Sequence, residues 1–405
     1  MKGYIKKIQG VICRQFLKVK IIFQCNFKKK TIKNYKDAMK FLNEKNYDCK
    51  TSCIRSNDEL KMWNYQLSII IPAYNCENSV ERCIKSVLSQ KLKYTYEIIV
   101  VNDGSTDNTK DVLNKFKNIE NIHVIEQENK GYSGARNTGI DFATGRYLMF
   151  LDSDDEMLPN GIKALLDRAY EYDADIVEGG FRYIYPNGKY SNNPSSDEIK
   201  EIPMPLGILE GFFWAKVYKR EIFDGIRLPE GYWFEDSLNL HILFWKSKKS
   251  IVIPELVYGY YKNESGITHT SKKRLKSIDS LYITESLIKD HLEMGFDITQ
   301  DYYEYFLRMV KLTYYRTREM DEKVRNSIFL CQCYLYENYF SSFSTGVREM
   351  VKLELSLKAR NYKTYILSRI INIFVQIMLE RYVHSKISGT SILGGMRFLL
   401  VDSQT

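Results

Sequence analysis

Three neighbouring carboxylates form the strongest chemical signal in the sequence. Residues 148–156 read LMFLDSDDE, so an apolar run leads directly into Asp152, Asp154 and Asp155. Carboxylates this close repel one another unless a cation or hydrogen-bond donors compensate their charge. Mg²⁺ and Mn²⁺ take oxygen ligands and can bridge the oxygens of a diphosphate. The pattern therefore indicates a divalent metal site; for the triplet alone, a helix-capping loop is the alternative.

Three further polar segments contain groups that could hold a nucleotide. In VNDGST, Asp103 could accept from a base or a ribose, or could cap the next helix. In PAYN, Tyr74 offers a flat ring to a nucleobase, although the segment alone is only a turn. NKGYSGARN combines two glycines with Lys130 and Arg136, which suits a backbone that approaches a negatively charged nucleotide. It lacks the P-loop and GxGxxG motifs, which argues against a nucleotide triphosphatase or a dehydrogenase.

These four segments each follow a predicted strand, in a region where strands and helices alternate. Such alternation is typical of βαβ units and a parallel sheet, in which ligands bind at the carboxyl ends of the strands. Residues 186–188 predict a hairpin that continues the domain, and beyond residue 275 the pattern is helical. The predicted strands are residues 67–71, 97–101, 122–126, 147–151 and 176–180, and the predicted helices are residues 78–90, 108–116, 133–143 and 161–172.

The positive charge is concentrated at the N-terminus. Residues 1–50 hold fourteen Lys or Arg against three acidic residues, so the rest of the chain carries about −2 of the net charge of +9. Because it also contains apolar residues, this segment fits an anionic membrane surface, where each basic residue contributes roughly 1 kcal/mol. A solvated basic tail explains it equally well. Since the remaining chain has no basic stripe, we exclude nucleic acid as a partner.

The sequence also indicates where the protein resides. No signal peptide is recognisable, no apolar run reaches eighteen residues, and the eight cysteines lack zinc-ligand spacing. We therefore expect a cytoplasmic protein, with the inner face of the cell membrane as a candidate peripheral location. Residues 365–383 carry a broad apolar face that either packs on the catalytic domain or lies on a membrane. His241, Cys331 and Cys333 are expected to pack in the core.

Taken in order, the segments resemble the bacterial family 2 glycosyltransferases, which have the GT-A nucleotide-diphosphosugar transferase fold. The resemblance rests on SIIIPAYNCENSVERCIKSVLSQ, EIIVVNDGSTDNT, ENKGYSGARNTGIDFATGRYLMFLDSDDE, and WAKVYKREIF followed by FED. It covers roughly residues 66–265 and implies an α/β domain with a Rossmann-like, mixed but mainly parallel sheet. The expected parts are a basic N-terminal appendage (residues 1–64), a GT-A catalytic domain (residues 65–272) and a C-terminal helical region (residues 273–405).

The resemblance implies roles for individual residues on the donor side. Asp154 would be the direct ligand of a divalent metal, Mn²⁺ or Mg²⁺, between the phosphates. Asp152 would hold the ribose or a metal-bound water. Asp103 would bind the base, and Lys130 and Arg136 would lie against the nucleotide. The other residues implied in nucleotide binding are Pro72, Ala73, Tyr74, Asn75, Glu77 and Ser153.

On the acceptor side, the pair Glu235 and Asp236 matches the acidic pair of the family. Asp236 would be the catalytic base and Glu235 would support it; the alternative is capping of the next helix, which the helix dipole favours for carboxylates. Trp214 and Lys216 match a family segment near the acceptor, and Trp233 could stack on a sugar face. This assignment implies inverting transfer without a covalent enzyme intermediate.

The implied partners are a nucleotide sugar donor and a glycan or lipid-linked acceptor. UDP is the expected nucleotide, with GDP and dTDP as alternatives, and a hexosyl or N-acetylhexosaminyl group would be moved in cell-surface polysaccharide or glycolipid synthesis. An inactive relative that binds nucleotide sugars as a membrane assembly partner is the alternative from another class. Residues 260–270 resemble the closing loop of the family, in which Ser265, Thr268 or His269 could reach the diphosphate or the metal.

Overall fold

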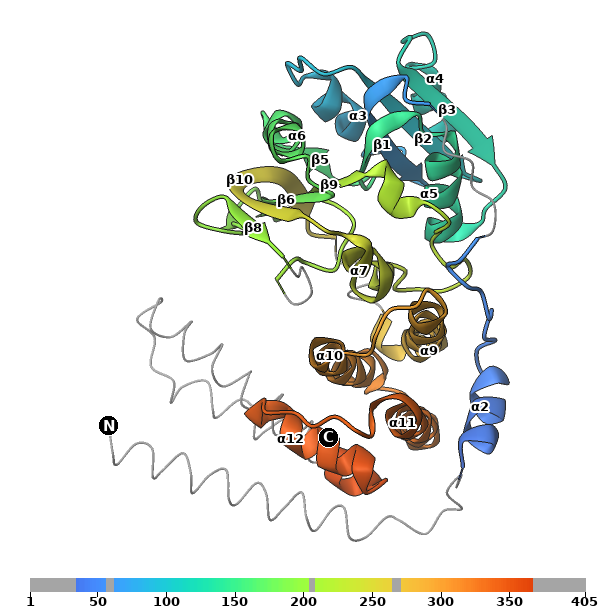
Figure 1. Ribbon diagram of the computed structural model, residues 1–405. Coiled ribbons are helices and arrows are strands. Elements are labelled where there is room, and N and C mark those ends of the chain that lie inside the picture. Colours follow the sequence, from blue (N-terminus) through green and yellow to red (C-terminus); the bar gives the residue numbers. More distant parts are fainter. Residues whose placement is uncertain (1–33, 56–61, 204–207, 264–270, 367–405) are drawn as a thin grey trace, which may run out of the picture.

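The computed structural model describes residues 34–55, 62–203, 208–263 and 271–366. Figure 1 shows two layers: a sheet flanked by helices above, and a set of helices below. Ser265, Thr268 and His269 of the predicted closing loop lie outside the described residues. The same holds for residues 1–33 of the basic segment and for residues 367–383 of the predicted apolar helix.

A ten-stranded mixed sheet forms the upper layer. Its strands are β1 (Tyr65–Ala73), β2 (Tyr96–Asp103), β3 (Ile122–Gln127), β4 (Gly145–Phe150), β5 (Glu156–Met157), β6 (Ile176–Ile184), β7 (Tyr190–Asn193), β8 (Lys200–Ile202), β9 (Lys216–Lys219) and β10 (Ser250–Tyr261). The order is β3-β2-β1-β4-β9-β6-β10-β5, with β7 paired to β6 and β8 to β10. The run β3-β2-β1-β4 is parallel, whereas β9 is antiparallel to both its neighbours. The predicted parallel sheet and the β6–β7 hairpin are therefore confirmed.

The two faces of the sheet support two hydrophobic clusters, because successive side chains of a strand point to opposite faces. In β1, Ile69 and Ile71 belong to the first cluster and Ile70 to the second. The second face packs closely on a helix, since a Cβ at Gly139 would lie 2.3 Å from Ile70 Cγ2. Helices α3 (Val80–Leu88), α4 (Thr109–Asn114) and α6 (Gly161–Tyr172) contribute to the first cluster and α5 (Gly131–Phe142) to the second.

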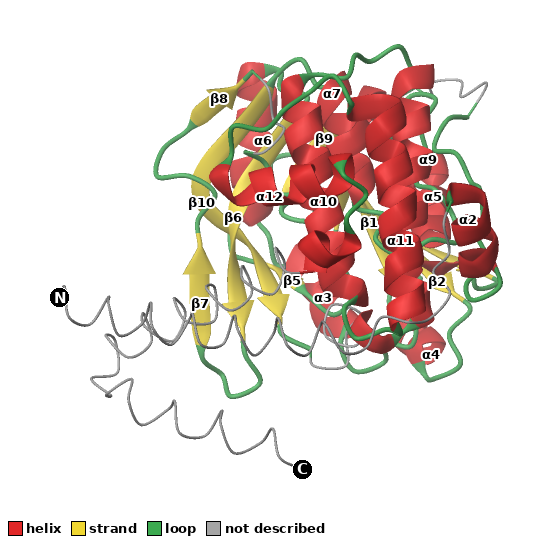
Figure 2. Cartoon of the chain, turned by 90° about the horizontal axis from the view of Figure 1, so that it is seen from below, coloured by secondary structure: helices red, strands yellow, loops and turns green. Residues whose placement is uncertain are grey.

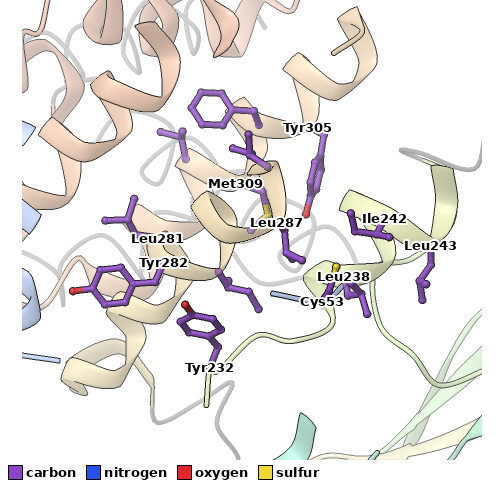
Figure 3. Packing of buried hydrophobic residues seen from close by; sticks show 14 of the residues in the cluster. Cys53, Tyr232, Leu238, Ile242, Leu243, Leu281, Tyr282, Leu287, Tyr305 and Met309 are labelled. Atoms are coloured by element: carbon purple, nitrogen blue, oxygen red, sulfur yellow. The ribbon is translucent and has the colours of Figure 1, made fainter. Parts of the chain in front are cut away.

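A layer of helices covers the second face, as the view in Figure 2 makes clear. Their apolar side chains share one cluster with the segment that precedes β10. In Figure 3, Leu287, Tyr305 and Met309 of these helices pack beside Leu238 and Ile242. The helices are α2 (Tyr35–Asn43), α7 (Phe244–Lys246), α9 (Asp279–Glu293), α10 (Gln300–Thr317), α11 (Glu322–Leu335) and α12 (Arg348–Lys358), with 3₁₀ turns η1 (Arg220–Phe223), η3 (Ser271–Lys273) and η4 (Leu275–Ile278) and π turns η2 (Asn239–Leu243) and η5 (Tyr336–Phe340).

Residues 34–55 are tied to the helical layer although they precede the sheet in sequence. α2 lies against α11, and Tyr35 donates to Glu285 Oε1 over 2.7 Å. Farther along, Ser52 donates to Asp290 Oδ1 over 2.8 Å. The division of the chain at residues 64 and 272 stays a prediction, but these contacts show that the part after residue 33 packs on the C-terminal helices.

Two further predictions concern the core and the membrane. His241 is fully buried, and its Nδ1 lies 2.6 Å from Tyr302 Oη, so its packing in the core is confirmed. Cys331 and Cys333 are likewise buried. Within the described ranges, no helix is both long and apolar enough to cross a bilayer.

Candidate active site

The loops after β1 and β2 hold each other through hydrogen bonds. Asn75, at a left-handed φ of 48°, donates from its backbone N–H to Ser105 Oγ over 3.0 Å. Thr106 N–H donates back to Asn75 Oδ1 over 2.8 Å. Glu77 Oε2 accepts from both the backbone and the side chain of Asn108, at 2.9 and 2.7 Å. Asn75 and Glu77 thus fix the neighbouring loop, which orders the edge of the sheet where a nucleoside would lie.

Tyr74 is the accessible residue of the PAYN segment. Pro72 and Ala73 are buried at the end of β1, whereas 48% of Tyr74 is exposed. Its ring is therefore free to stack on a flat ligand.

Asp103 ends β2 as a buried carboxylate. Its Oδ1 accepts from Gln127 Nε2 at 2.6 Å and from the backbone N–H of Lys130 at 2.8 Å. A Cβ at Gly104, whose φ is +73°, would lie 2.9 Å from the Asn129 nitrogen, so only glycine allows this close approach. Among the described residues no donor contacts Asp103 Oδ2, which leaves that oxygen available to a ligand N–H or O–H.

The three carboxylates after β4 lie in different environments. Asp155 is buried and accepts from Tyr258 Oη and from the Tyr261 backbone N–H, both at 2.7 Å. It is therefore a structural carboxylate. Asp154 is exposed to solvent at the surface. Desolvation by the surrounding protein, and then the charge of Asp152, nevertheless raise its pKa to about 6. A carboxylate whose charge is opposed in this way is one that a bound cation stabilises.

Arg136 joins two carboxylates that lie 83 residues apart in sequence. It is 5% exposed, with its Nη2 at 2.8 Å from Asp152 Oδ1 and its Nη1 at 2.5 Å from Glu235 Oε1. Burial acts to lower the pKa of Arg136, but the two carboxylates raise it above its ordinary value. Both terminal nitrogens already donate to carboxylates, and contact of Arg136 with a nucleotide stays a prediction. The side chain of Lys130 at the start of α5 is exposed.

Asp236 follows Glu235 in a turn that leads into η2. The turn contains Phe234 at a left-handed φ of 71° and closes through a 3.1 Å hydrogen bond from Asn239 N–H to the Asp236 carbonyl oxygen. Burial, and then the charge of Glu235, raise the pKa of Asp236 to about 6. No side chain in the described part of the protein donates to its carboxylate. Asp236 is thus a partly buried carboxylate that remains free to accept a proton.

Comparison with known proteins identifies the family of the segment that carries the loops after β1, β2, β3 and β4. Residues 68–227 match the family described as Glycosyl transferase family 2. These residues belong to that family. The chain is also 31% identical over 212 residues to glycosyltransferase GlyA of Streptococcus pneumoniae, and 39% identical over 211 residues to a poly(ribitol-phosphate) beta-glucosyltransferase of Bacillus spizizenii. The matches cover 48% and 50% of this chain but only 30% and 33% of the two relatives.

The fold of the chain resembles that of a solved structure. S. aureus TarS 1-349, crystallised in complex with UDP-GlcNAc, superposes with a TM-score of 0.60 over 81% of this chain and 93% of that chain. At 17% identity the likeness concerns the fold, which is the predicted GT-A α/β fold with a mostly parallel, curled sheet and a C-terminal helical region.

A divalent metal at this site would have few ligands from the protein. Within the described ranges, no cluster of three or more His, Cys, Asp or Glu side chains could enclose one. Mg²⁺, however, is usually held by one or two carboxylates together with waters and substrate phosphates. Asp154, exposed and with a raised pKa, is the carboxylate that suits this arrangement; Ser153 is half-buried beside it.

The predicted acceptor residues fall into two groups. Trp214 is half-buried in an aromatic stack, 3.5 Å from the Phe212 ring centroid and 4.7 Å from that of Tyr258. Trp233 is half-buried, and its backbone N–H donates to Asp279 Oδ2 over 2.8 Å. Acceptor contact stays a prediction for both tryptophans.

Lys216 differs from them because it is fully buried. Its amine lies 2.8 Å from Glu178 Oε2 and donates to the Phe212 carbonyl oxygen over 2.8 Å. Burial lowers its pKa even though Glu178 opposes the change. The amine has no exposed surface and both observed partners are internal, which indicates a structural role, while acceptor contact stays a prediction for Lys216 as well.

The buried ion pair of Lys216 and Glu178 predicts a stability effect. Lys216→Met is expected to lower the free energy of unfolding by about 3–5 kcal/mol, because it leaves Glu178 buried without its partner. The double variant Lys216→Met/Glu178→Leu should recover most of the loss. Urea denaturation of both variants tests this. A wild-type unfolding curve for Lys216→Met, together with a raised KM for acceptor, would instead support acceptor contact.

Two arginines near the site carried no signal in the sequence. Arg82 on α3 donates to the carbonyl oxygen of Asp154, and its guanidinium lies 3.7 Å from the centroid of the Tyr261 ring. Arg316 on α10 lies over the ring of Phe234, two residues before Asp236. Both are single basic residues on helices, and only their tertiary neighbours distinguish them from solvated charges.

Proposed function

We propose that this chain is an inverting glycosyltransferase that moves a hexosyl or N-acetylhexosaminyl group from a UDP-sugar to an acceptor hydroxyl. The observation that carries the proposal is the pair of carboxylates on either side of Arg136. This arginine binds Asp152, two residues from Asp154, and Glu235, the neighbour of Asp236. The carboxylates proposed for the sugar-donor side and the proposed base are thereby linked through one buried arginine.

The donor and the biological setting are supported by the relatives. The TarS structures contain UDP-GlcNAc or UDP, and the Bacillus relative is a glucosyltransferase that acts on poly(ribitol-phosphate). Both favour a UDP-sugar and an acceptor in cell-surface polysaccharide or glycolipid synthesis. The basic composition of residues 1–50 favours a cytoplasmic enzyme at the inner face of the membrane.

In the proposed mechanism, Tyr74 stacks on the uracil ring and Asp103 Oδ2 accepts from its N–H. Asp236 takes the proton of the acceptor hydroxyl as the oxygen attacks the anomeric carbon from the face opposite the diphosphate. One C–O bond forms as the bond to the diphosphate oxygen breaks, and UDP leaves. Asp154 would hold a divalent cation, Mn²⁺ or Mg²⁺, which neutralises the charge that develops on the leaving diphosphate.

The proposal is tested by nucleotide release from UDP-, GDP- and dTDP-sugars, with and without Mn²⁺, for the wild type and Asp154→Ala. We expect release of UDP that requires the metal and falls by at least about 10²-fold in the variant, because charge stabilisation at the leaving group is lost. Asp197→Ala, a change at an exposed aspartate, should behave as the wild type. Metal-independent binding without turnover would favour the inactive relative.

A further inference from the structure

We propose that Arg316 of the C-terminal helical region is a positioning residue for Asp236. Its guanidinium holds the turn that carries the base and places a positive charge near it. The inference rests on the proposed function, in which Asp236 is the base. It brings the C-terminal helices into the site, because α10, like Asp236 itself, lies outside the residues that match the family.

The contact between Arg316 and Phe234 carries the argument. The Arg316 Cζ lies 3.5 Å from the centroid of the Phe234 ring, a stacking distance for a guanidinium on an aromatic face. Phe234 has a φ of 71°, a left-handed conformation that is strained for a bulky residue and persists only where the surroundings hold it. Glu235 and Asp236 follow directly, so the stack fixes the direction in which both carboxylates leave the turn.

Arg316 is itself anchored from a second helix. Its Nη1 donates to Ser280 Oγ on α9 over 2.9 Å, and Ser280 Oγ lies 2.9 Å from Thr313 Oγ1 on α10. In the described part of the chain no carboxylate lies within 4.0 Å of Arg316, so no ion pair of its own neutralises it. Its charge therefore acts on the nearest carboxylates at longer range, in a partly buried setting where screening is weak.

The charge of Arg316 stabilises the ionised form of Asp236. Burial and Glu235 raise the pKa of Asp236, and Arg316 and Arg136 oppose that rise. Arg136 is already shared between two carboxylates, whereas Arg316 is not. The charged and titratable groups that act on or near Asp236 are Glu235, Arg136 on α5, Asp152 after β4, Lys216 and Tyr218 on β9, and Tyr305 and Arg316 on α10.

The test follows the ionisation of Asp236 directly. Protein labelled with ¹³Cγ-aspartate in metal-free buffer gives one carboxyl resonance that is absent from Asp236→Asn, and its titration midpoint is measured by NMR. In Arg316→Gln the midpoint should rise by about one pH unit or more, since an opposite charge near a carboxylate shifts its pKa by that order. Arg308→Gln, an exposed arginine on the same helix, should leave it unchanged. An unchanged midpoint in folded Arg316→Gln overturns the inference.

Arg316→Lys separates charge from stacking and serves if the glutamine variant does not fold. Lysine keeps the charge but lacks the planar group, so the midpoint should stay near that of the wild type while kcat for UDP release falls about tenfold or more. A wild-type kcat in Arg316→Lys, with an unchanged melting temperature, would show that stacking on Phe234 does not position the base.

The two proposals fail in different ways. Absence of UDP release from any sugar nucleotide by the wild type would contradict the proposed function, while the NMR titration would still decide whether Arg316 acts on Asp236. Normal release by the wild type, with no response of Asp236 to either Arg316 variant, would contradict only the inference.

Discussion

Asp236→Asn is expected to reduce the rate of sugar transfer by about 10²- to 10⁴-fold, the usual contribution of a general base. The amide has nearly the same shape as the carboxylate but cannot take the proton of the acceptor hydroxyl. KM for the donor should change little, since Asp236 belongs to the acceptor side. The measurement is steady-state release of UDP with saturating acceptor, and Asp197→Asn at an exposed position is the matched control.

The same residue predicts the pH dependence. A base acts in its unprotonated form, and the pKa of Asp236 is raised to about 6 by burial and by Glu235. The value of kcat/KM should therefore rise with pH through about 6 and become level above about 7. Activity that falls as pH rises through this range, or that survives in Asp236→Asn, would assign the proton transfer to another group.

Arg136→Met is expected to affect both stability and activity. It removes one cation from two carboxylates, Asp152 and Glu235, and leaves both partly buried without a partner. Loss of one side of a buried ion pair costs about 3–5 kcal/mol, so the free energy of unfolding should fall by at least that amount. We expect kcat for UDP release to fall by at least about 10²-fold, because Asp152 on the donor side and Glu235 on the acceptor side are no longer held by one arginine.

Two control variants separate the effect of Arg136→Met on activity from its effect on stability. Arg136→Lys can pair with one carboxylate but cannot bridge both in the same geometry, so its loss in stability should be intermediate. Arg227→Met removes another buried arginine, which binds the half-exposed Asp141 away from the catalytic carboxylates, and should lower stability with little change in kcat. Equal losses of kcat in Arg136→Met and Arg227→Met would attribute the effect to general destabilisation.

Local patterns predicted the elements whose periodicity is strong. α6 has the predicted bounds, and β1, β2 and β3 contain the predicted strands. In β1 and β2 the signal is an apolar run, because a parallel strand buried on both faces is mostly apolar. β9 escaped prediction, since its four residues were considered only as part of the motif WAKVYKREIF, in which Lys216 was assigned to the acceptor side. The buried position of Lys216 follows from the insertion of β9 between β4 and β6, which is a tertiary event that no local pattern reports.

For the candidate site, the sequence named single residues but not the contacts between them. Asp103, Asp154 and Asp236 were singled out by type and by position after predicted elements, and the structure leaves each with a free oxygen or an unpartnered carboxylate. The bridge made by Arg136 was not predicted, because Asp152 and Glu235 are distant in sequence and meet only when the sheet is complete.

The contacts of residues 34–55 limit how this protein can be cut or recombined. A truncation at residue 64 would remove α2 and the Ser52 contact to Asp290, and would uncover the buried surface of α11. An expression boundary before residue 34 avoids this damage. A chimera that exchanged everything after residue 272 would also need residues 34–55 of the same parent, since these residues and the C-terminal helices pack on each other.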